Sequence, residues 1–185
     1  MDTEHDIKPQ LRHSLLDLRG SLADTARQGW DSQICEHVEH YLKPFPFATL
    51  GIYFSVRNEP ELLDLYIRLS QSGIILSLPV VQASQAPLLF ARWAPGEPLV
   101  SDRFGIPTPS VRHFVSLPDA LLIPCLGFTR ERFRLGYGGG FYDRTLEQLP
   151  RPHTIGVSYS CLETSFPTQE HDVALDCLIT ENGIL

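Results

Sequence analysis

A glycine-rich segment between a short apolar run and a predicted helix most constrains what this chain can fold into. Residues 134–144 read Arg-Leu-Gly-Tyr-Gly-Gly-Gly-Phe-Tyr-Asp-Arg. The apolar run 120–124 is typical of a buried strand, and residues 142–149 favour a helix. Glycine permits positive φ and close approach to the backbone, and exposed N–H groups before a helix can bind an anion. The order strand, glycine loop, helix therefore predicts a phosphate-binding loop.

The segment differs from two common phosphate-binding motifs. A dinucleotide fingerprint needs glycine or alanine where this chain has Phe141, and a Walker loop ends in Gly-Lys-Ser/Thr. A tight turn that needs several glycines is the alternative interpretation. The flanking Arg134 and Arg144, with Tyr142 and Asp143 between them, favour a ligand-binding loop.

Short apolar runs alternate with helical patterns along the chain. We predict helices over residues 11–22, 31–42 and 60–71, the first with a stripe formed by Leu11, Leu15, Leu18 and Leu22. We predict strands over residues 49–54, 74–81, 88–93, 120–124, 153–159 and 174–180. This alternation indicates an α/β fold, with a largely parallel sheet covered on both faces, in a single domain spanning residues 1–185. Ligands bind beyond the carboxyl ends of such strands, so the glycine loop and the segment after Phe54 are expected to share a crevice.

Composition excludes several classes of function. The net charge is 15 − 22 = −7, which disfavours nucleic acid as a partner. Apolar runs stay well below the roughly 18 residues of a membrane span, and the acidic start is unlike a signal peptide. The four cysteines are scattered without a CxxC pair, which argues against a metal staple or a disulfide scaffold. We expect a cytoplasmic protein without a membrane partner.

Basic residues near the start form one candidate set. Lys8 and Arg12 are neighbours on one predicted helix face, and Arg19 lies two turns farther on. Like charges at this spacing gain from a shared anion, although a solvated face is the alternative.

Acidic residues form the other candidate set. Glu59 can support the start of a helix at Pro60, or accept hydrogen bonds from the ring nitrogens of a substrate. Asp143 can cap a helix and Asp172 can be an ordinary loop acid. As a pair they can instead hold Mg²⁺, which prefers one or two carboxylates plus phosphate oxygens and water.

The segment RLGYGGGFYDR, preceded by LLIPCLGF and followed by EHDVALD and ITENGI, closely resembles the 5-formyltetrahydrofolate cyclo-ligases (5,10-methenyltetrahydrofolate synthetases). KPQLR, YFSVRNEPEL, LPVV and residues 105–107 extend the resemblance over nearly the whole chain. It implies a three-layer α/β/α sandwich that is Rossmann-like, of the NagB/RpiA/CoA-transferase-like type. It also implies a reaction that uses ATP and Mg²⁺ to convert 5-formyltetrahydrofolate to 5,10-methenyltetrahydrofolate.

The resemblance also implies roles for individual residues. Expected ATP contacts are Lys8, Pro9, Gln10, Leu11, Arg12, Arg134, Leu135, Gly136, Tyr137, Gly138, Gly139, Gly140, Phe141 and Tyr142. The folate pocket is expected to include Phe54, Glu59, Tyr137, Gly138, Gly139, Gly140 and Phe141. The expected metal ligands are Asp143 and Asp172, and the expected catalytic residues are Arg134, Arg144 and Lys8.

The chain departs from the family pattern at two positions, with Thr108 in place of a glutamate and Thr129 in place of an aspartate. Two other functions stay open: an ATP-dependent enzyme of the same fold acting on another small molecule, and a non-catalytic folate- or nucleotide-binding regulator. A monomer or weak homodimer is expected. His171, beside Asp172, is the one histidine that we single out.

Overall fold

The computed structural model describes residues 7–168 and 172–185. This part of the chain contains helices α1 Ile7–Ser21, α2 Asp24–Leu42, α3 Leu63–Gln71 and α4 Phe141–Leu146, and the 3-10 helix η1 Ser160–Leu162. The main sheet has the order β12-β11-β10-β7-β1-β2-β3-β6. Its strands are β1 Thr49–Gly51, β2 Ile75–Val80, β3 Leu89–Arg92, β6 Phe114–Val115, β7 Ala120–Pro124, β10 His153–Val157, β11 Cys177–Thr180 and β12 Gly183–Ile184. Two small antiparallel sheets pair β4 Leu99–Ser101 with β5 Pro107–Pro109, and β8 Gly127–Phe128 with β9 Arg134–Leu135.

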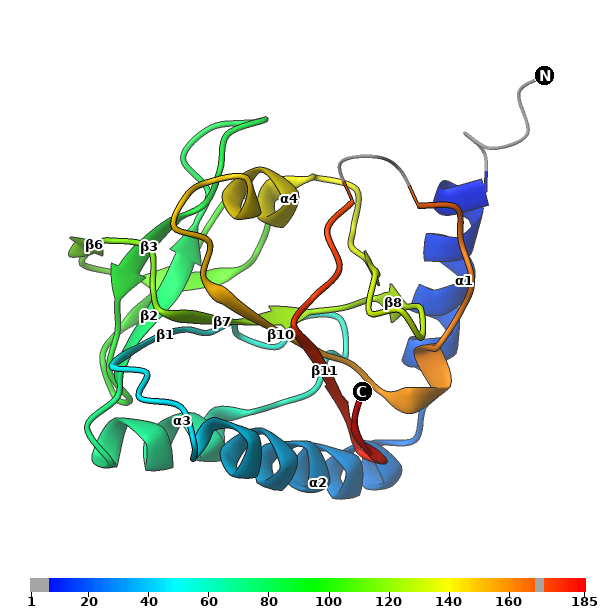
Figure 1. The fold of residues 1–185 in the computed structure, drawn as a ribbon, viewed down its shortest axis with the longest axis horizontal. Helices are drawn as coiled ribbons and strands as arrows, with labels where there is room; N and C mark the ends of the chain where they lie inside the picture. The colour runs from blue at the N-terminus through cyan, green and yellow to red at the C-terminus, as the bar shows by residue number, and fades with distance from the viewer. Residues whose placement is uncertain (1–6, 169–171) are drawn as a thin grey trace.

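The central strands β11, β10, β7, β1 and β2 run parallel; β12 pairs antiparallel with β11 at one margin, and β3 pairs antiparallel with both β2 and β6 at the other. Helices α2 and α3 lie along one side of the sheet and α4 lies on the other, while α1 stands at the end beside β8 (Figure 1). The predicted α/β class with a largely parallel central sheet is therefore confirmed.

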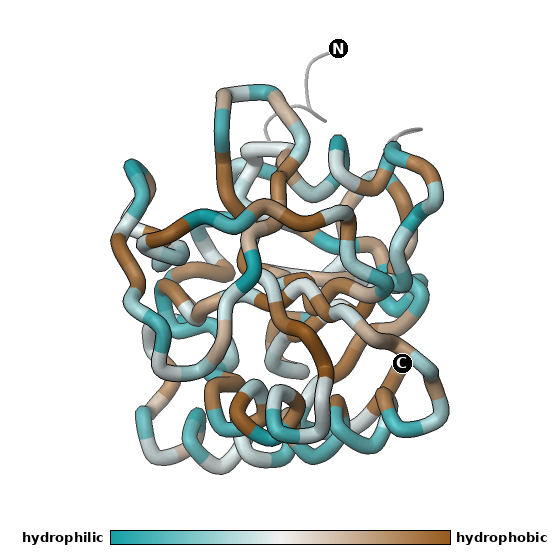
Figure 2. The backbone as a smooth tube through the Cα atoms, turned by 90° about the vertical axis from the view of Figure 1, so that its left-hand side faces the viewer, coloured by the Kyte–Doolittle hydropathy of each residue, from teal (hydrophilic) through white to brown (hydrophobic). Residues whose placement is uncertain are grey.

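Each face of the sheet carries its own hydrophobic core. Alternate residues of β7 point to opposite faces, as a strand requires. Leu122 joins the core that includes Val38 of α2, whereas Leu121 and Ile123 join the core that includes Leu146 of α4. Figure 2 shows hydrophobic stretches mainly in the interior and hydrophilic stretches along the outer turns at the bottom of the view. Burial on both faces explains why β7 is an uninterrupted apolar run.

The buried face of α1 differs from the predicted leucine stripe. Leu15 is buried and Leu11 and Leu22 pack against the core, but Leu18 is 41% exposed and Arg19 is fully buried. At about 100° per residue, positions 8, 12 and 19 fall within about 40° of one another, beside the leucine stripe. The helix is therefore rotated so that its basic edge, as well as its apolar stripe, faces the protein.

Several predicted bounds were wrong by a few residues. Helix α2 begins at Asp24 rather than at position 31, and β1 ends at Gly51 rather than at 54. Helix α3 begins at Leu63 rather than at 60, and the carboxylate of Glu61, two residues earlier, accepts the N–H of Leu63 at 3.1 Å. Helix α4 ends at Leu146 rather than at 149, consistent with Pro150 disfavouring helical backbone just before it.

The proline-rich connection contains structure that the sequence patterns did not predict. Strands β4 and β5 form a hairpin within it, and β6 adds a short strand at the margin of the main sheet. These strands are two or three residues long, too short to give a readable alternation. Strands β10 and β11 are likewise shorter than the predicted ranges 153–159 and 174–180.

Asp119 ties the beginnings of β1 and β7 together. Its carboxylate accepts the N–H groups of Ala48 and Thr49, both at 2.9 Å, and these hydrogen bonds lower its pKa from the ordinary 3.8. A lowered pKa in the folded state means that this stabilisation is present above pH 3.8 and is lost as the pH falls through the lowered value. We expect Asp119→Asn to reduce the free energy of unfolding at pH 7 by about 0.5–1 kcal/mol, a modest value because the carboxylate is exposed. Urea unfolding at pH 7 and at about pH 3 checks this, and an equal difference at both pH values would contradict it.

Candidate active site

A cleft of about 850 Å³ opens beyond the carboxyl ends of the parallel strands. Its walls come from the segments that follow β1 and β2, the end of β7, the glycine loop, the β4–β5 hairpin and one edge of α1. The lining includes these predicted site residues: Lys8, Arg12, Phe54, Glu59, Arg134, Leu135, Gly136, Tyr137, Gly138, Gly139, Gly140, Phe141, Tyr142, Asp143 and Asp172. The expected shared crevice between the glycine loop and the segment after β1 is therefore present.

Four residues in the predicted set do not line the cleft. Pro9 and Gln10 are exposed on α1, and Leu11 packs against the core. The guanidinium of Arg144 lies 5.4 Å from the centre of the Phe141 ring, and its Nη2 donates to the carbonyl of Gly139. Arg144 thus supports the loop.

The glycine loop adopts a backbone conformation that residues with a side chain rarely adopt. Gly138 has φ +91° and Gly140 has φ +63°, and Gly140 is the N-cap residue of α4. Arg12 Nε donates to the carbonyl of Gly136 at 2.8 Å. The loop is therefore held by side chains from α1 and α4. Asp143 lies in the first turn of α4, so the alternative that it is the cap is wrong.

Two base–acid pairs lie in the cleft. Lys8 Nζ lies 2.9 Å from Asp172 Oδ2, and Arg134 Nη2 lies 2.6 Å from Asp143 Oδ1. The Arg134 guanidinium is also 5.3 Å from the centre of the Tyr142 ring. The two carboxylates suit Mg²⁺, which takes one or two protein carboxylates and completes its shell with phosphate and water oxygens. Among the residues described, no cluster of three His, Cys, Asp or Glu side chains forms an all-protein metal site.

Glu59 is the most buried acid in the cleft, with 2% of its surface exposed. Its Oε2 accepts the N–H of Val56 at 3.0 Å and its Oε1 accepts the hydroxyl proton of Tyr137. Burial raises the pKa of Glu59 above the ordinary 4.5, although hydrogen bonds from Tyr137 and Val56 oppose this shift. The alternative that Glu59 supports a helix start is wrong, because α3 begins later and the carboxylate turns back onto its own loop.

Several cleft residues were not among the predicted site residues. Arg57, with φ +51°, places its guanidinium 5.2 Å from the centre of the Tyr137 ring. Phe104, on the turn between β4 and β5, lies 6.1 Å from Phe141 by ring centres, and Asp102 lines the cleft beside it. A tight turn after β1 was the available signal for Arg57, whereas nothing in the proline-rich segment marked the other two.

The two departures from the family pattern lie in buried positions. Thr108 is fully buried in β5, and its hydroxyl donates to the carbonyl of Val100 at 3.2 Å. Thr129 is 6% exposed. Neither lines the cleft. His171 lies outside the described residues.

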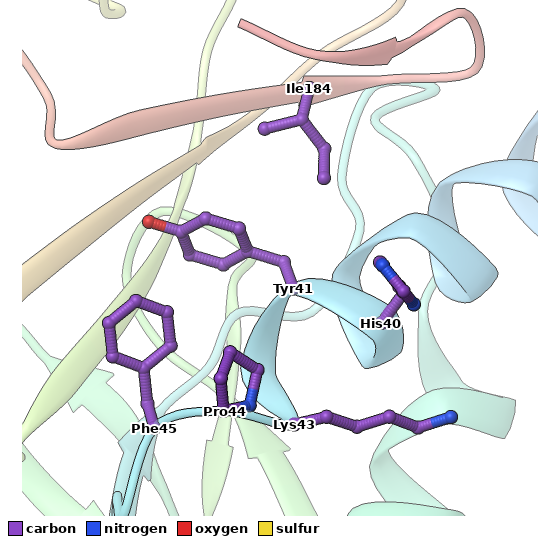
Figure 3. A pocket seen from close by; sticks show the side chains of 6 residues that line it. All are labelled: His40, Tyr41, Lys43, Pro44, Phe45 and Ile184. Atoms are coloured by element: carbon purple, nitrogen blue, oxygen red, sulfur yellow. The ribbon is translucent and has the colours of Figure 1, made fainter.

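A second, shallower hollow lies at the far end of α2, lined by His40, Tyr41, Lys43, Pro44, Phe45 and Ile184. Figure 3 shows Tyr41 between Phe45 and Ile184, with the Lys43 side chain extending away from them. The rings of Tyr41 and Phe45 are 5.2 Å apart. The charged residues predicted for the site are all elsewhere, so the cleft remains the candidate active site.

Comparison with known proteins identifies the family of this chain. Residues 4–181 match the model of the 5-formyltetrahydrofolate cyclo-ligase family, and the chain belongs to that family. A 5-formyltetrahydrofolate cyclo-ligase of Mycolicibacterium smegmatis is 31% identical over 191 residues, which cover 96% of each chain. Another, of Haemophilus influenzae, is 29% identical and covers 91% of this chain and 94% of its own. The solved 5,10-methenyltetrahydrofolate synthetase of Mycoplasma pneumoniae superposes with a TM-score of 0.80 at 27% identity, covering 98% of this chain and 99% of the other.

Among the described residues, no helix combines the length and apolarity that crossing a bilayer requires. All four cysteines are unpaired thiols, and Cys161 is the exposed one.

Proposed function

We propose that this protein uses ATP to close 5-formyltetrahydrofolate to 5,10-methenyltetrahydrofolate, releasing ADP and phosphate. The observation that carries the proposal is the placement of a glycine loop, two base–acid pairs and a buried glutamate around one cleft. We further propose a cytoplasmic enzyme that acts as a monomer or weak homodimer on its small-molecule substrates alone.

In this reaction the main task of the protein is to position the reacting groups. The formyl oxygen is a poor leaving group, and transfer of the γ-phosphoryl group to it gives an activated imidate. Nitrogen N10 of the same substrate then attacks the formyl carbon and gives up its proton, which leaves with phosphate, so that the N–C bond forms while the C–O bond breaks. The protein supplies no nucleophile, so its contribution is to align the reacting atoms and neutralise charge that moves toward ADP.

The basic residues of the cleft suit the phosphate chain. Lys8 and Arg134 each hold a carboxylate, and we propose that both turn toward phosphate oxygens when ATP binds. Asp143 and Asp172 would then hold Mg²⁺, which supplies positive charge to the phosphate oxygens. Arg12 keeps its hydrogen bond to the loop, and Arg144 keeps the loop in shape.

The other part of the cleft suits the folate. Glu59 presents a buried carboxylate that can accept hydrogen bonds from N–H groups of the pterin ring. Phe54 and Phe141 line the same cleft and offer ring faces to the pterin or aminobenzoyl group.

The direct test is to follow the absorbance of the methenyl product with ATP, Mg²⁺ and 5-formyltetrahydrofolate. Product formation that requires all three components is the expected result. ATP turnover only with another acceptor would point to a different ligase of this fold. Tight folate binding without turnover would point to a regulator.

Asp143→Asn should raise the Mg²⁺ concentration needed for half-maximal rate by about ten-fold or more, because an amide is a neutral and weaker ligand for a hard cation. A Mg²⁺ titration at fixed ATP measures the change. Asp119→Asn, which makes the same chemical change far from the cleft, is the matched control and should leave the titration unchanged. Identical titrations for both variants would remove Asp143 from the metal site.

A further inference from the structure

Arg19 is a wholly buried cation that lies behind the cleft. A charge without solvent is costly unless the protein surrounds it with acceptors or opposite charge. Among the described residues, Arg19 makes no direct ion pair with a carboxylate, and its Nη1 has no hydrogen-bond partner. Burial with so little direct compensation indicates a role other than stability.

The two hydrogen bonds that Arg19 does make lead to the cleft. Its Nε donates to the carbonyl of Arg57 at 2.9 Å, on the loop that follows β1. Its Nη2 donates to the Tyr137 hydroxyl oxygen at 2.5 Å, on the glycine loop. One side chain of α1 therefore joins two of the loops that line the cleft.

The Tyr137 hydroxyl connects Arg19 to Glu59. Because its oxygen accepts a hydrogen bond from Arg19, its own proton is free to be donated, and it is donated to Glu59 Oε1. The order is guanidinium, hydroxyl, carboxylate; the guanidinium and the carboxylate are buried, with 0% and 2% exposed, whereas Tyr137 is 37% exposed. Between two buried charged groups, successive hydrogen bonds polarise one another and favour a single direction for the middle proton.

We propose that Arg19 is a positioning residue for the reaction, which directs the Tyr137 hydroxyl proton onto Glu59 and so keeps the Glu59 carboxylate oriented and ionised for substrate N–H groups. This inference depends on the proposed function only for its activity measurement. Arg19 does not line the cleft and acts through Tyr137.

The charges that face Glu59 define the expected pH effect. Arg19 on α1 and Arg57 on the same loop favour its anion, and Tyr137 donates to it. Tyr53, Tyr142 and Cys125 are also close enough to interact, and burial raises the pKa of each, so they are neutral near pH 7. Removing the Arg19 charge therefore raises the pKa of Glu59 further, and the anion is lost at a higher pH.

The experiment compares Arg19→Met and Arg19→Lys with the wild-type protein. We expect the acid limb of kcat/KM for the folate to move up by about one pH unit in Arg19→Met. We expect kcat/KM at pH 7 to fall about ten-fold or more, with KM for ATP unchanged. Arg19→Lys keeps the charge and should retain the wild-type acid limb. Arg68→Met, on the half-exposed face of α3, is the control and should change neither.

A merely structural role for Arg19 makes a different prediction. In that case Arg19→Met should lower activity equally at every pH and leave the acid limb in place. This result would overturn the proposal. Tyr137→Phe removes the connecting hydroxyl without removing the ring, so the effects of Arg19→Met and Tyr137→Phe should not add. Additive effects would also overturn it. Tyr137→Phe carries the pH measurement if Arg19→Met fails to fold.

A titration that needs no activity separates this inference from the proposed function. Carbon-13 NMR of the Glu59 carboxyl should show a higher pKa in Arg19→Met than in the wild type. An unchanged pKa would refute the role of Arg19, whatever the substrate is. Absence of product from the wild-type protein would refute the proposed function and leave this titration valid.

Discussion

Glu59→Gln should lower kcat/KM for 5-formyltetrahydrofolate by about 30- to 1,000-fold, equivalent to about 2–4 kcal/mol. The carboxylate is buried. When the substitution removes it, the substrate N–H group loses its hydrogen-bond acceptor, and no water molecule is there to take its place. The amide also brings a donor toward the Val56 N–H and the Tyr137 hydroxyl, where the carboxylate accepts from both. Initial rates at saturating ATP measure the effect, which should appear mainly in KM for the folate.

The neighbouring acid provides a matched control for this change. Glu61 lies outside the cleft and accepts the N–H of Leu63 at the start of α3, and burial raises its pKa as well. Glu61→Gln should keep nearly full activity. A comparable loss in both variants would mean that Glu59 acts through the stability of its loop and not through contact with the folate.

The wild-type pH profile gives a second check on Glu59. Its raised pKa means that the carboxyl becomes protonated at a pH above the ordinary 4.5 as the solution is acidified. The folate kcat/KM of the wild type should therefore decline on the acid side within a range above pH 4.5. Glu59→Gln should lack this limb.

Gly138→Ala should lower kcat/KM by about 10- to 100-fold, while the same substitution at Gly96 should leave it unchanged. The two glycines have nearly the same φ, +91° and +94°, so the backbone strain of about 1–2 kcal/mol should be equal. A Cβ at Gly96 meets nothing within 4 Å and a Cβ at Gly138 makes only an ordinary van der Waals contact, at 3.4 Å from the Arg12 guanidinium carbon, so the expected difference comes from the place of the strained backbone, because Gly138 lines the cleft. A displacement of even about 1 Å in positioning groups can cost a factor of about 10² in rate.

Steady-state rates and thermal melting of both variants make this comparison. Equal losses of stability with a loss of activity only in Gly138→Ala would support the loop as part of the active site. Equal activity in the two variants would mean that the loop is an ordinary turn against the interior.

The sequence patterns best predicted the elements in which every residue is apolar because both faces are buried. The apolar run of β7 was placed correctly because burial on both faces leaves no polar position to confuse the pattern. They failed for β4, β5 and β6, which are short and are stabilised by partners elsewhere in the chain. The rotation of α1 was also missed, since a hydrophobicity pattern cannot show that an arginine is buried by hydrogen bonds to two loops.

The same limit applies to the site. The glycine-rich motif, the basic and acidic candidates and, above all, the resemblance to the cyclo-ligase family marked most of the cleft lining. Arg57 and Phe104 reach it through a left-handed turn and a hairpin, and only the folded backbone brings them there. Cleft residues that a local sequence motif marks could thus be predicted, whereas residues that only the tertiary fold brings to the cleft could not.

The pair of Lys8 and Asp172 has a consequence for how the protein is made. These residues are 164 positions apart. During synthesis, the ribosome must therefore translate past Asp172 before Lys8 and Asp172 can meet in the cleft. Prematurely terminated products that lack the final segment should be inert even where their sheet has formed.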